Sequence, residues 1–305
     1  IIPSMISSKR LLYLQLYQAE TLIANSKKLS FSDRHKDQYL DKLVSLFQAI
    51  KASISPEMDE AKIFERKNHL DFIFKSLEFL KDSTLNTIPF EVVGCLDNAM
   101  RDWIDADKFI IVTSLQNNLY SFSYDLSYAK NDIFYKSLET EYGISFDKKL
   151  VQINLPLILS RDYLSSVALY HELGHFVDMQ FNITAVAELL IYKGIAPNFE
   201  ELKKSLPVLQ EPILNREKVR SHFGEHFSDI FAAQYIGKTI GLFLQYISND
   251  SDMDSATHPS TKSRIKVIED FVDGTSNPIV DYLQQIVQAL TNTHLQQRFS
   301  PISSE

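Results

Sequence analysis

The sequence predicts a mainly α-helical fold with a small β-sheet, an α+β arrangement, on two observations. Glycine is scarce, with only 8 in 305 residues, and long segments are rich in Leu, Lys, Glu, Gln and Ala, which favour helix. After the turn-like segment 83–89, short runs of β-branched and aromatic residues interrupt the helical pattern. We therefore expect an N-terminal helical region at residues 1–85 and a second, mixed domain at residues 86–305.

Three helices in succession are expected in the N-terminal region. The first begins near Ser8, the second follows the cap-like pair Ser32-Asp33, and the third begins after Pro56. Each carries apolar residues at helical spacing. Such stripes are typical of a bundle core, so we assign them to packing and not to a cofactor.

The second domain is expected to begin with a helix at residues 90–104 and to continue into the sheet. Three β-type runs predict its strands: 109–113, 120–124 and 150–155. We expect the last of these to be an edge strand that could bind substrate by strand addition. Three prolines in 194–212 predict an irregular excursion around a short helical piece, and helix resumes near Glu217.

Composition and charge exclude several classes of protein. A formal charge of -8 and a pI near 5.5 give no electrostatic reason to expect binding to nucleic acid. No apolar stretch is long enough to cross a membrane. The single cysteine, Cys95, excludes an internal disulfide and is expected to be a buried small apolar residue. We expect a soluble, cytoplasmic protein, although a chain that starts with Ile leaves secretion open.

A His-Glu-x-x-His motif occupies residues 171–175 within an apolar, helical stretch. Positions four apart share one face of a helix, so His171 and His175 can both direct a ring nitrogen at one metal ion. Neutral imidazoles suit Zn²⁺ and leave room for a third protein ligand and a water molecule. Glu172 can then act as general base, taking a proton from that water and passing it to a leaving amine. The sequence therefore predicts one zinc ion per chain.

A third ligand is expected from the later run 223–233, which holds a carboxylate in an apolar, helical setting. Glu225 and Asp229 lie one turn apart there, so Glu225 can bind the metal while Asp229 accepts a hydrogen bond from the far nitrogen of a ligand histidine. The alternative is that both lie on a solvated helix face. Four other side chains stay open as the third ligand: Glu188, Glu217, His222 and His226.

The extended metzincin pattern, HExxHxxGxxH, does not occur. Its glycine and third histidine would fall at positions that hold Asp178 and Phe181 in this chain. That class of metalloprotease is therefore rejected.

The motifs together resemble the gluzincin pattern of HExxH followed by ExxxD, found in thermolysin-like enzymes and in the CAAX prenyl endopeptidase and heat-shock membrane protease family. The second part is carried by Gly-Glu-His-Phe-Ser-Asp-Ile-Phe at residues 224–231. The segment 257–265 is similar to a His-Pro segment with a later Arg-Ile that follows the third-ligand helix in the latter family. The matches fall within residues 165–270, in the expected order, and leave residues 1–85 uncovered.

The resemblance implies a zincin-like catalytic domain with zinc endopeptidase chemistry. The residues onto which it carries that chemistry are the ligands His171, His175 and Glu225, the base Glu172, and Asp229 behind the ligands. It further implies that His258 and Arg264 line the site and stabilise a developing oxyanion. The alternative is that Pro259 marks an ordinary helix start and that Arg264 pairs with an acid. The family's membrane helices have no counterpart here, so a membrane-bound substrate is not expected.

The leading hypothesis is a metallopeptidase that hydrolyses a protein or peptide. One alternative is a non-catalytic or regulatory zinc-binding protein that binds a protein partner, with residues 1–85 as the binding region. Another is a metal-dependent hydrolase of a non-peptide bond, for which the chain shows no phosphate-binding signature.

Overall fold

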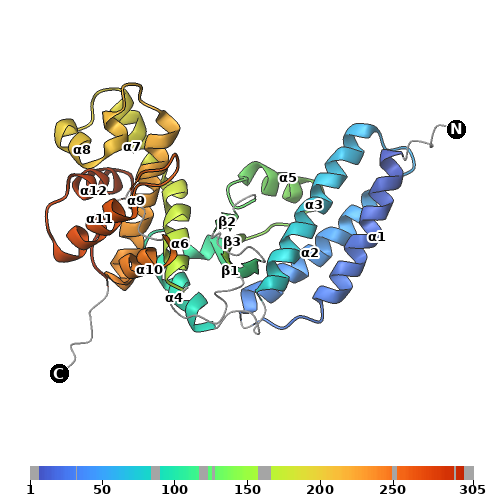
Figure 1. Cartoon of the computed structure of the whole chain (residues 1–305). Coiled ribbons are helices and arrows are strands. Elements are labelled where there is room, and N and C mark those ends of the chain that lie inside the picture. The colour runs from blue at the N-terminus through green and yellow to red at the C-terminus, as the bar shows by residue number, and fades with distance from the viewer. Residues whose placement is uncertain are drawn as a thin grey trace. The chain divides into compact units, whose positions relative to one another are not determined.

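The structure is a computed structural model, and the fold class predicted from the sequence is confirmed: helices dominate and one small sheet is present (Figure 1). The described residues are 7–31, 33–83, 90–116, 123–125, 128–156, 166–248, 253–291 and 293–298. The chain divides into two compact units. Unit 1 comprises Ile1–Asp97, Asp105–Asn117 and Asp125–Asn154, and unit 2 comprises Asn98–Ile104, Asn118–Tyr124 and Leu155–Glu305. The predicted functional division at residue 85 stays a prediction.

The three helices predicted at the N-terminus are present in unit 1, as α1 (Ser8–Ser26), α2 (Arg34–Ser53) and α3 (Glu60–Asp82). Each begins where a side chain caps its first turn, because the first backbone N–H groups of a helix lack intrahelical partners. The capping oxygens belong to Ser7, Asp33 and Asp59. A shorter helix that the sequence analysis did not identify, α5 (Asp132–Tyr142), packs against α2.

The core of unit 1 is a cluster of aliphatic and aromatic side chains from these helices and from the strands. Phe72 of α3 is fully buried, and its ring meets those of Tyr128, Phe134, Tyr135 and Phe146. The apolar stripes of α2 and α3 therefore serve packing, as the sequence predicts. The prediction is only partly right for α1, which buries Leu12 and Leu16 but exposes Leu11, Leu14 and Tyr17.

The sheet has the strand order β1-β3-β2, with β1 at Phe109–Gln116, β2 at Ser123–Asp125 and β3 at Lys149–Pro156. The runs 109–113 and 150–155 are strands as predicted, while residues 120–122 of the remaining run lie outside the described residues. The expectation that 150–155 is an edge strand is wrong. β3 comes last in the sequence but lies between the other two strands, so its backbone groups are used inside the sheet and are not free for strand addition.

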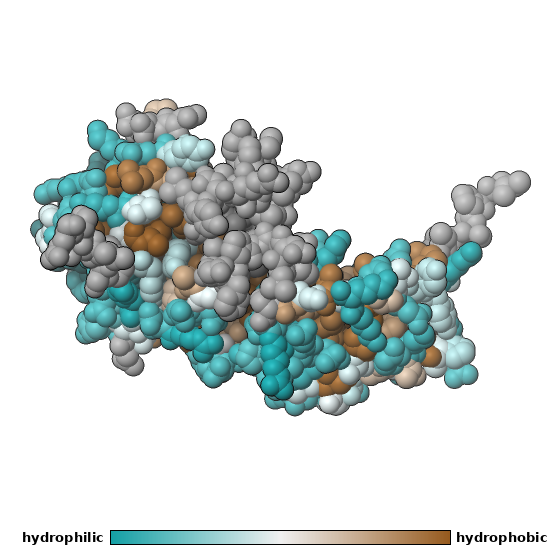
Figure 2. Space-filling model, turned by 90° about the horizontal axis from the view of Figure 1, so that it is seen from below, coloured by the Kyte–Doolittle hydropathy of each residue, from teal (hydrophilic) through white to brown (hydrophobic). Residues whose placement is uncertain are grey.

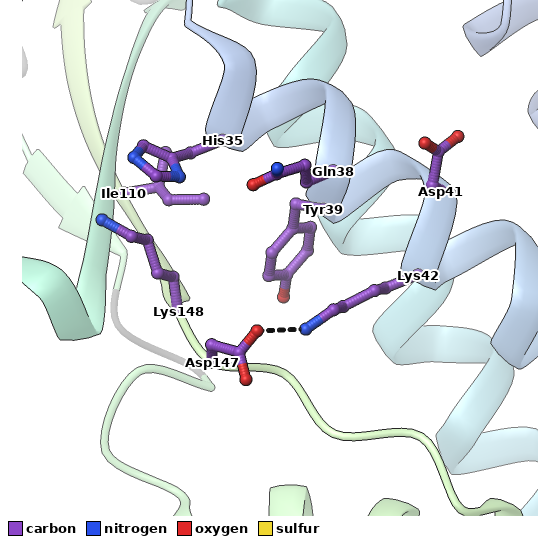
Figure 3. A pocket seen from close by; sticks show the side chains of 8 residues that line it. All are labelled: His35, Gln38, Tyr39, Asp41, Lys42, Ile110, Asp147 and Lys148. Carbon is purple, nitrogen blue, oxygen red and sulfur yellow. Dashed lines mark hydrogen bonds and ion pairs between the residues drawn. The ribbon is translucent and has the colours of Figure 1, made fainter.

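Unit 1 also holds a polar pocket of about 520 Å³ beside the first turns of α2 (Figure 3). His35, Gln38 and Tyr39 of α2 point into it, and Lys42 Nζ forms an ion pair of 2.5 Å with Asp147 Oδ2 at its rim. None of the side chains predicted to carry chemistry lines this pocket.

Unit 2 is built around α9 (Arg216–Ile236), which is buried along most of its length. α6 (Ser166–Phe181), α7 (Ile183–Tyr192), α10 (Thr239–Ser248), α11 (Thr261–Asp273) and α12 (Pro278–Thr291) all contact it. The predicted excursion at 194–212 is present and contains α8 (Phe199–Ser205) and a 3-10 turn at Pro207–Gln210. The other helices of unit 2 thus surround α9, which carries several charged side chains.

Helix α4 (Phe90–Arg101) is shorter than the predicted 90–104, and the expectation that Cys95 is buried is wrong because its side chain is exposed. Among residues 94–101 of this helix, whose burial is described, Leu96, Ala99 and Met100 are buried at spacings of three and four, and Cys95 falls outside that stripe. No helix among the described residues is long and apolar enough to span a membrane, as the sequence predicts.

Candidate metal centre

Helix α6 brings the two motif histidines together. Its apolar residues Leu169, Leu173 and Phe176 are fully buried, and this packing turns the face with His171 and His175 toward α9. The Nε2 atoms of His171 and His175 are 3.0 Å apart. Two ring nitrogens at this distance cannot both direct a lone pair into the same space unless a cation, either a proton or a metal ion, lies between them.

Glu225 on α9 completes a group of three. Its Oε2 lies 3.5 Å from His171 Nε2, and its Oε1 lies 3.5 Å from His175 Nε2. One ligand atom from each of the three residues lies within 4.8 Å of the others. The three side chains could therefore hold one metal ion.

The donor atoms fit a tetrahedral ion. Metal–nitrogen distances of about 2.0–2.1 Å and tetrahedral angles place two ligand atoms about 3.3 Å apart. The 3.0 Å between the two histidine nitrogens is close to this value, and each nitrogen lies 3.5 Å from one oxygen of Glu225, His171 from Oε2 and His175 from Oε1. Three protein ligands of this kind leave a fourth position for water or substrate.

The other candidates for third ligand are engaged elsewhere or lie outside this group. Glu188 accepts a hydrogen bond of 3.0 Å from Arg216, and His222 Nε2 donates to the Ser255 carbonyl at 3.0 Å. His226 is fully buried, and burial lowers its pKa to about 4. Neither His226 nor Glu217 belongs to the group with His171 and His175.

Asp229 lies behind the histidines and is completely buried. His171 Nδ1 is 2.9 Å from Asp229 Oδ1, so an Nδ1–H donated to this carboxylate leaves the lone pair at Nε2, on the side of Glu225. Such a contact fixes both the tautomer and the orientation of a ligand histidine. The contact between His171 Nδ1 and Asp229 is the one expected from the spacing of Glu225 and Asp229 along the helix.

Arg264 on α11 pairs with two acids of α9, Asp229 and Glu225. Its Nε and Nη2 donate to Asp229 Oδ2 and Oδ1, both at 2.7 Å, and its Nη1 lies 3.1 Å from Glu225 Oε2. The guanidinium group is buried and its forked geometry matches a carboxylate. The structure therefore shows the alternative in which Arg264 pairs with an acid. Its guanidinium group holds the carboxylates of Asp229 and Glu225 in place.

The charges of the cluster shift the pKa values of its members. Burial alone would raise the pKa of Asp229, but the guanidinium of Arg264 outweighs it and lowers the pKa to about 2. Burial likewise opposes the charge on His171, yet hydrogen bonds with Asp229 and Glu225 raise its pKa to about 10. Without a metal ion the His171 imidazole is thus protonated on both nitrogens and positively charged. Metal binding would replace one of these protons with the metal cation.

Glu172 follows His171 on α6 and is nine-tenths buried. Burial raises the pKa of its carboxyl group, while the nearby imidazoles of His171 and His175 act in the opposite direction. A carboxylate with a raised pKa is a better proton acceptor near neutral pH than an ordinary glutamate.

His258 lies at the exposed side of the centre. Its Nε2 is 3.6 Å from Glu225 Oε1, and its side chain is 56% exposed. Its Nδ1 lies 2.7 Å from Thr257 Oγ1. All the residues predicted from the sequence to form the site are thus described, and distances connect every one except Glu172, which is coupled to the others through charge.

The sequence analysis did not identify Gly174 as a site residue. A Cβ atom at Gly174 would lie 2.8 Å from the Ser228 Cα of α9, which is closer than such atoms approach one another. Only glycine therefore allows α6 and α9 to pack this closely. The signal available in the sequence was a glycine inside a helix, which is unfavourable unless packing requires it.

A second group of three potential ligands lies in unit 1: Glu65, His69 and Glu141. There a cation is already present, because Arg66 pairs with both carboxylates. The first group combines burial, two imidazoles and a carboxylate, and is the stronger candidate.

The site thus combines two imidazoles and a carboxylate that could hold one metal ion, with the buried carboxyl group of Glu172 beside them. No protein family, curated protein or solved structure matches the chain, so the functional argument rests on the geometry of these residues.

We expect Gly174→Ala to weaken metal binding, because α6 and α9 must move apart to admit the new Cβ. Overpacking of this kind costs about 1–3 kcal/mol, and the affinity for Zn²⁺ should fall roughly tenfold with a lower melting temperature. Gly224→Ala is the matched control, since its Cβ would meet His175 Cε1 at an ordinary 3.8 Å. Titration calorimetry and thermal melts should separate the two variants; equal effects would contradict the packing argument.

We expect Asp229→Asn to lower zinc affinity by about 10–100-fold, because the neutral amide no longer fixes His171 as a carboxylate does. It should also reduce the free energy of unfolding by about 3–5 kcal/mol, since Arg264 keeps a buried charge with a weakened partner. Asp273→Asn is the control, because it removes a carboxylate from an exposed pair with Lys238. Competition with a chelator and urea unfolding measure both effects.

Proposed function

We propose that this chain is a zinc-dependent endopeptidase in which His171, His175 and Glu225 bind the metal and Glu172 is the general base. The observation that supports it most directly is the convergence of two imidazoles and one carboxylate, from two helices, within 4.8 Å of one another. Three nitrogen and oxygen ligands with an open fourth position are typical of catalytic zinc, whereas structural zinc sites have four protein ligands.

Zinc is the metal that this donor set favours. Two imidazoles and one carboxylate suit Zn²⁺ better than Mg²⁺ or Ca²⁺, which prefer oxygen ligands alone. When bound, the ion would lower the pKa of a water molecule at its open position and polarise the carbonyl group of a substrate.

The residues of the chain would then perform the proton transfers. The Glu172 carboxylate accepts a proton from the attacking water as its oxygen bonds to the carbonyl carbon of the scissile peptide. Glu172 returns that proton to the amide nitrogen, which leaves as an amine when the C–N bond breaks. The raised pKa of Glu172 suits both steps, because the group must accept and release one proton near neutral pH.

Arg264 and His258 have different roles in this proposal. Arg264 is a positioning residue: its guanidinium holds Glu225 and Asp229 and is buried away from solvent. His258 is half exposed beside Glu225, so its imidazole is placed to donate a hydrogen bond to the oxyanion that develops on the substrate carbonyl.

We expect Glu172→Gln to retain one zinc per chain and to lose hydrolysis of an unfolded protein substrate by about 10²–10⁴-fold, because glutamine cannot accept the proton. His171→Ala and Glu225→Ala should lose most of the zinc. Elemental mass spectrometry on the purified variants and a peptide-release assay measure the two properties separately.

The outcomes separate the competing functions. Hydrolysis by Glu172→Gln at the wild-type rate would show that the assigned base is wrong. One zinc per wild-type chain, without hydrolysis of proteins or peptides, would favour the non-catalytic or regulatory zinc-binding protein. Zinc retained by Glu225→Ala would require another third ligand.

A further inference from the structure

Helix α1 is apolar on two of its faces. One face is buried in the core of unit 1 and consists of Leu12, Leu16, Ala19 and Ile23. The rest of its circumference exposes five large apolar side chains by 40–71%: Leu11, Tyr13, Leu14, Tyr17 and Leu22. The neighbouring α2 exposes none. A helix that meets water on its outer face normally carries polar residues there, so the outer face of α1 indicates a contact with another protein surface.

The exposed surface continues from α1 onto α3. An apolar groove of about 410 Å³ lies between the two helices, with Leu11 and Leu14 on one side and Ile63 and Phe64 on the other. Phe64 is itself 63% exposed. Figure 2 shows apolar side chains gathered in patches over the helical bundle, between hydrophilic ones. This groove lies on the side of α1 that faces α3, where Gln15, one of its lining residues, donates a hydrogen bond to Asp71.

A second exposed stripe of α1 has none of its residues in this groove, and the order of its charges indicates what it can bind. Arg10, Tyr13, Tyr17 and Glu20 follow one another at spacings of three, four and three residues, so they form one stripe along the helix. The stripe has a positive charge at one end, two aromatic rings in the middle and a negative charge at the other end. Along the helix axis its midpoint lies midway between Tyr13 and Tyr17, and the stripe residues on either side of this point match in pairs.

We propose that α1 is a dimerisation helix that packs against α1 of a second copy of this chain, antiparallel and about a twofold axis that crosses the stripe midway between Tyr13 and Tyr17. In this arrangement Arg10 of each copy faces Glu20 of the other, and each Tyr13 faces a Tyr17. A stripe with opposite charges at its two ends is complementary to itself only when the second copy runs in the opposite direction. The twofold axis makes each contact occur twice.

The existing contacts of the two charged residues permit this pairing. Arg10 is exposed, and within the described residues its guanidinium has no ion pair. Glu20 forms a pair of 2.8 Å with Lys51, but both side chains are about half exposed, so the pair is weak and can rearrange. Lys51 would remain beside Glu20 and the incoming arginine as part of a shared network.

Charge reversal in the full-length chain tests the proposal. The wild type is expected to associate reversibly in sedimentation-velocity experiments across micromolar concentrations. Arg10→Glu places two negative charges together at both contacts, and Glu20→Arg places two positive charges together. Each single variant should therefore dimerise roughly tenfold or more weakly, because the repulsion occurs twice.

Mixing the two single variants gives the decisive result. In a heterodimer of Arg10→Glu with Glu20→Arg, every contact again joins opposite charges, so an equimolar mixture should recover the wild-type dissociation constant. The control Lys28→Glu reverses an exposed charge outside the stripe and should dimerise as wild type does. Circular dichroism of each variant confirms folding.

A wild type that stays monomeric at all concentrations would overturn the proposal and leave the face of α1 to a different protein. So would a wild-type dimer that the single reversals do not weaken, or a mixture that does not recover. None of these outcomes depends on metal or on hydrolysis.

Discussion

The candidate centre depends on one buried carboxylate, Asp229, which has no exposed surface. A charge in such a place is strongly unfavourable unless it is paired and hydrogen-bonded. Arg264 supplies two hydrogen bonds and His171 supplies a third, so three helices are tied to one side chain. Because the same guanidinium reaches Glu225, the positions of a ligand histidine and the ligand carboxylate are set together.

Close packing fixes the remaining distance in the centre. The absence of a side chain at Gly174, directly before His175, lets α6 approach the backbone of α9 at Ser228, three residues after Glu225. The Nε2 atoms of the histidines and the carboxylate of Glu225 then converge without any loop between them. A metal centre held by rigid helices keeps its ligand geometry better than one on loops, which is what an open coordination position requires.

Sequence periodicity was sufficient for the three N-terminal helices and for the spacing of His171 and His175, which depends only on local helix geometry, but it did not identify α5. It was not sufficient for features that depend on distant segments. The position of β3 inside the sheet, the exposure of Cys95 and the approach at Gly174 each arise from packing partners that no local pattern specifies. Arg264 had two open roles because 35 residues separate it from Asp229, and only the fold shows that they pair.

The most direct test of the central claim is X-ray absorption spectroscopy of the zinc-loaded wild-type protein. We predict four nitrogen or oxygen neighbours at about 2.0–2.1 Å, with the outer-shell scattering of two imidazoles and no sulfur. Two imidazoles distinguish this centre from the group in unit 1, which has a single histidine. A spectrum with one imidazole or none, or with a sulfur neighbour, would contradict the account of His171, His175 and Glu225 as the metal ligands.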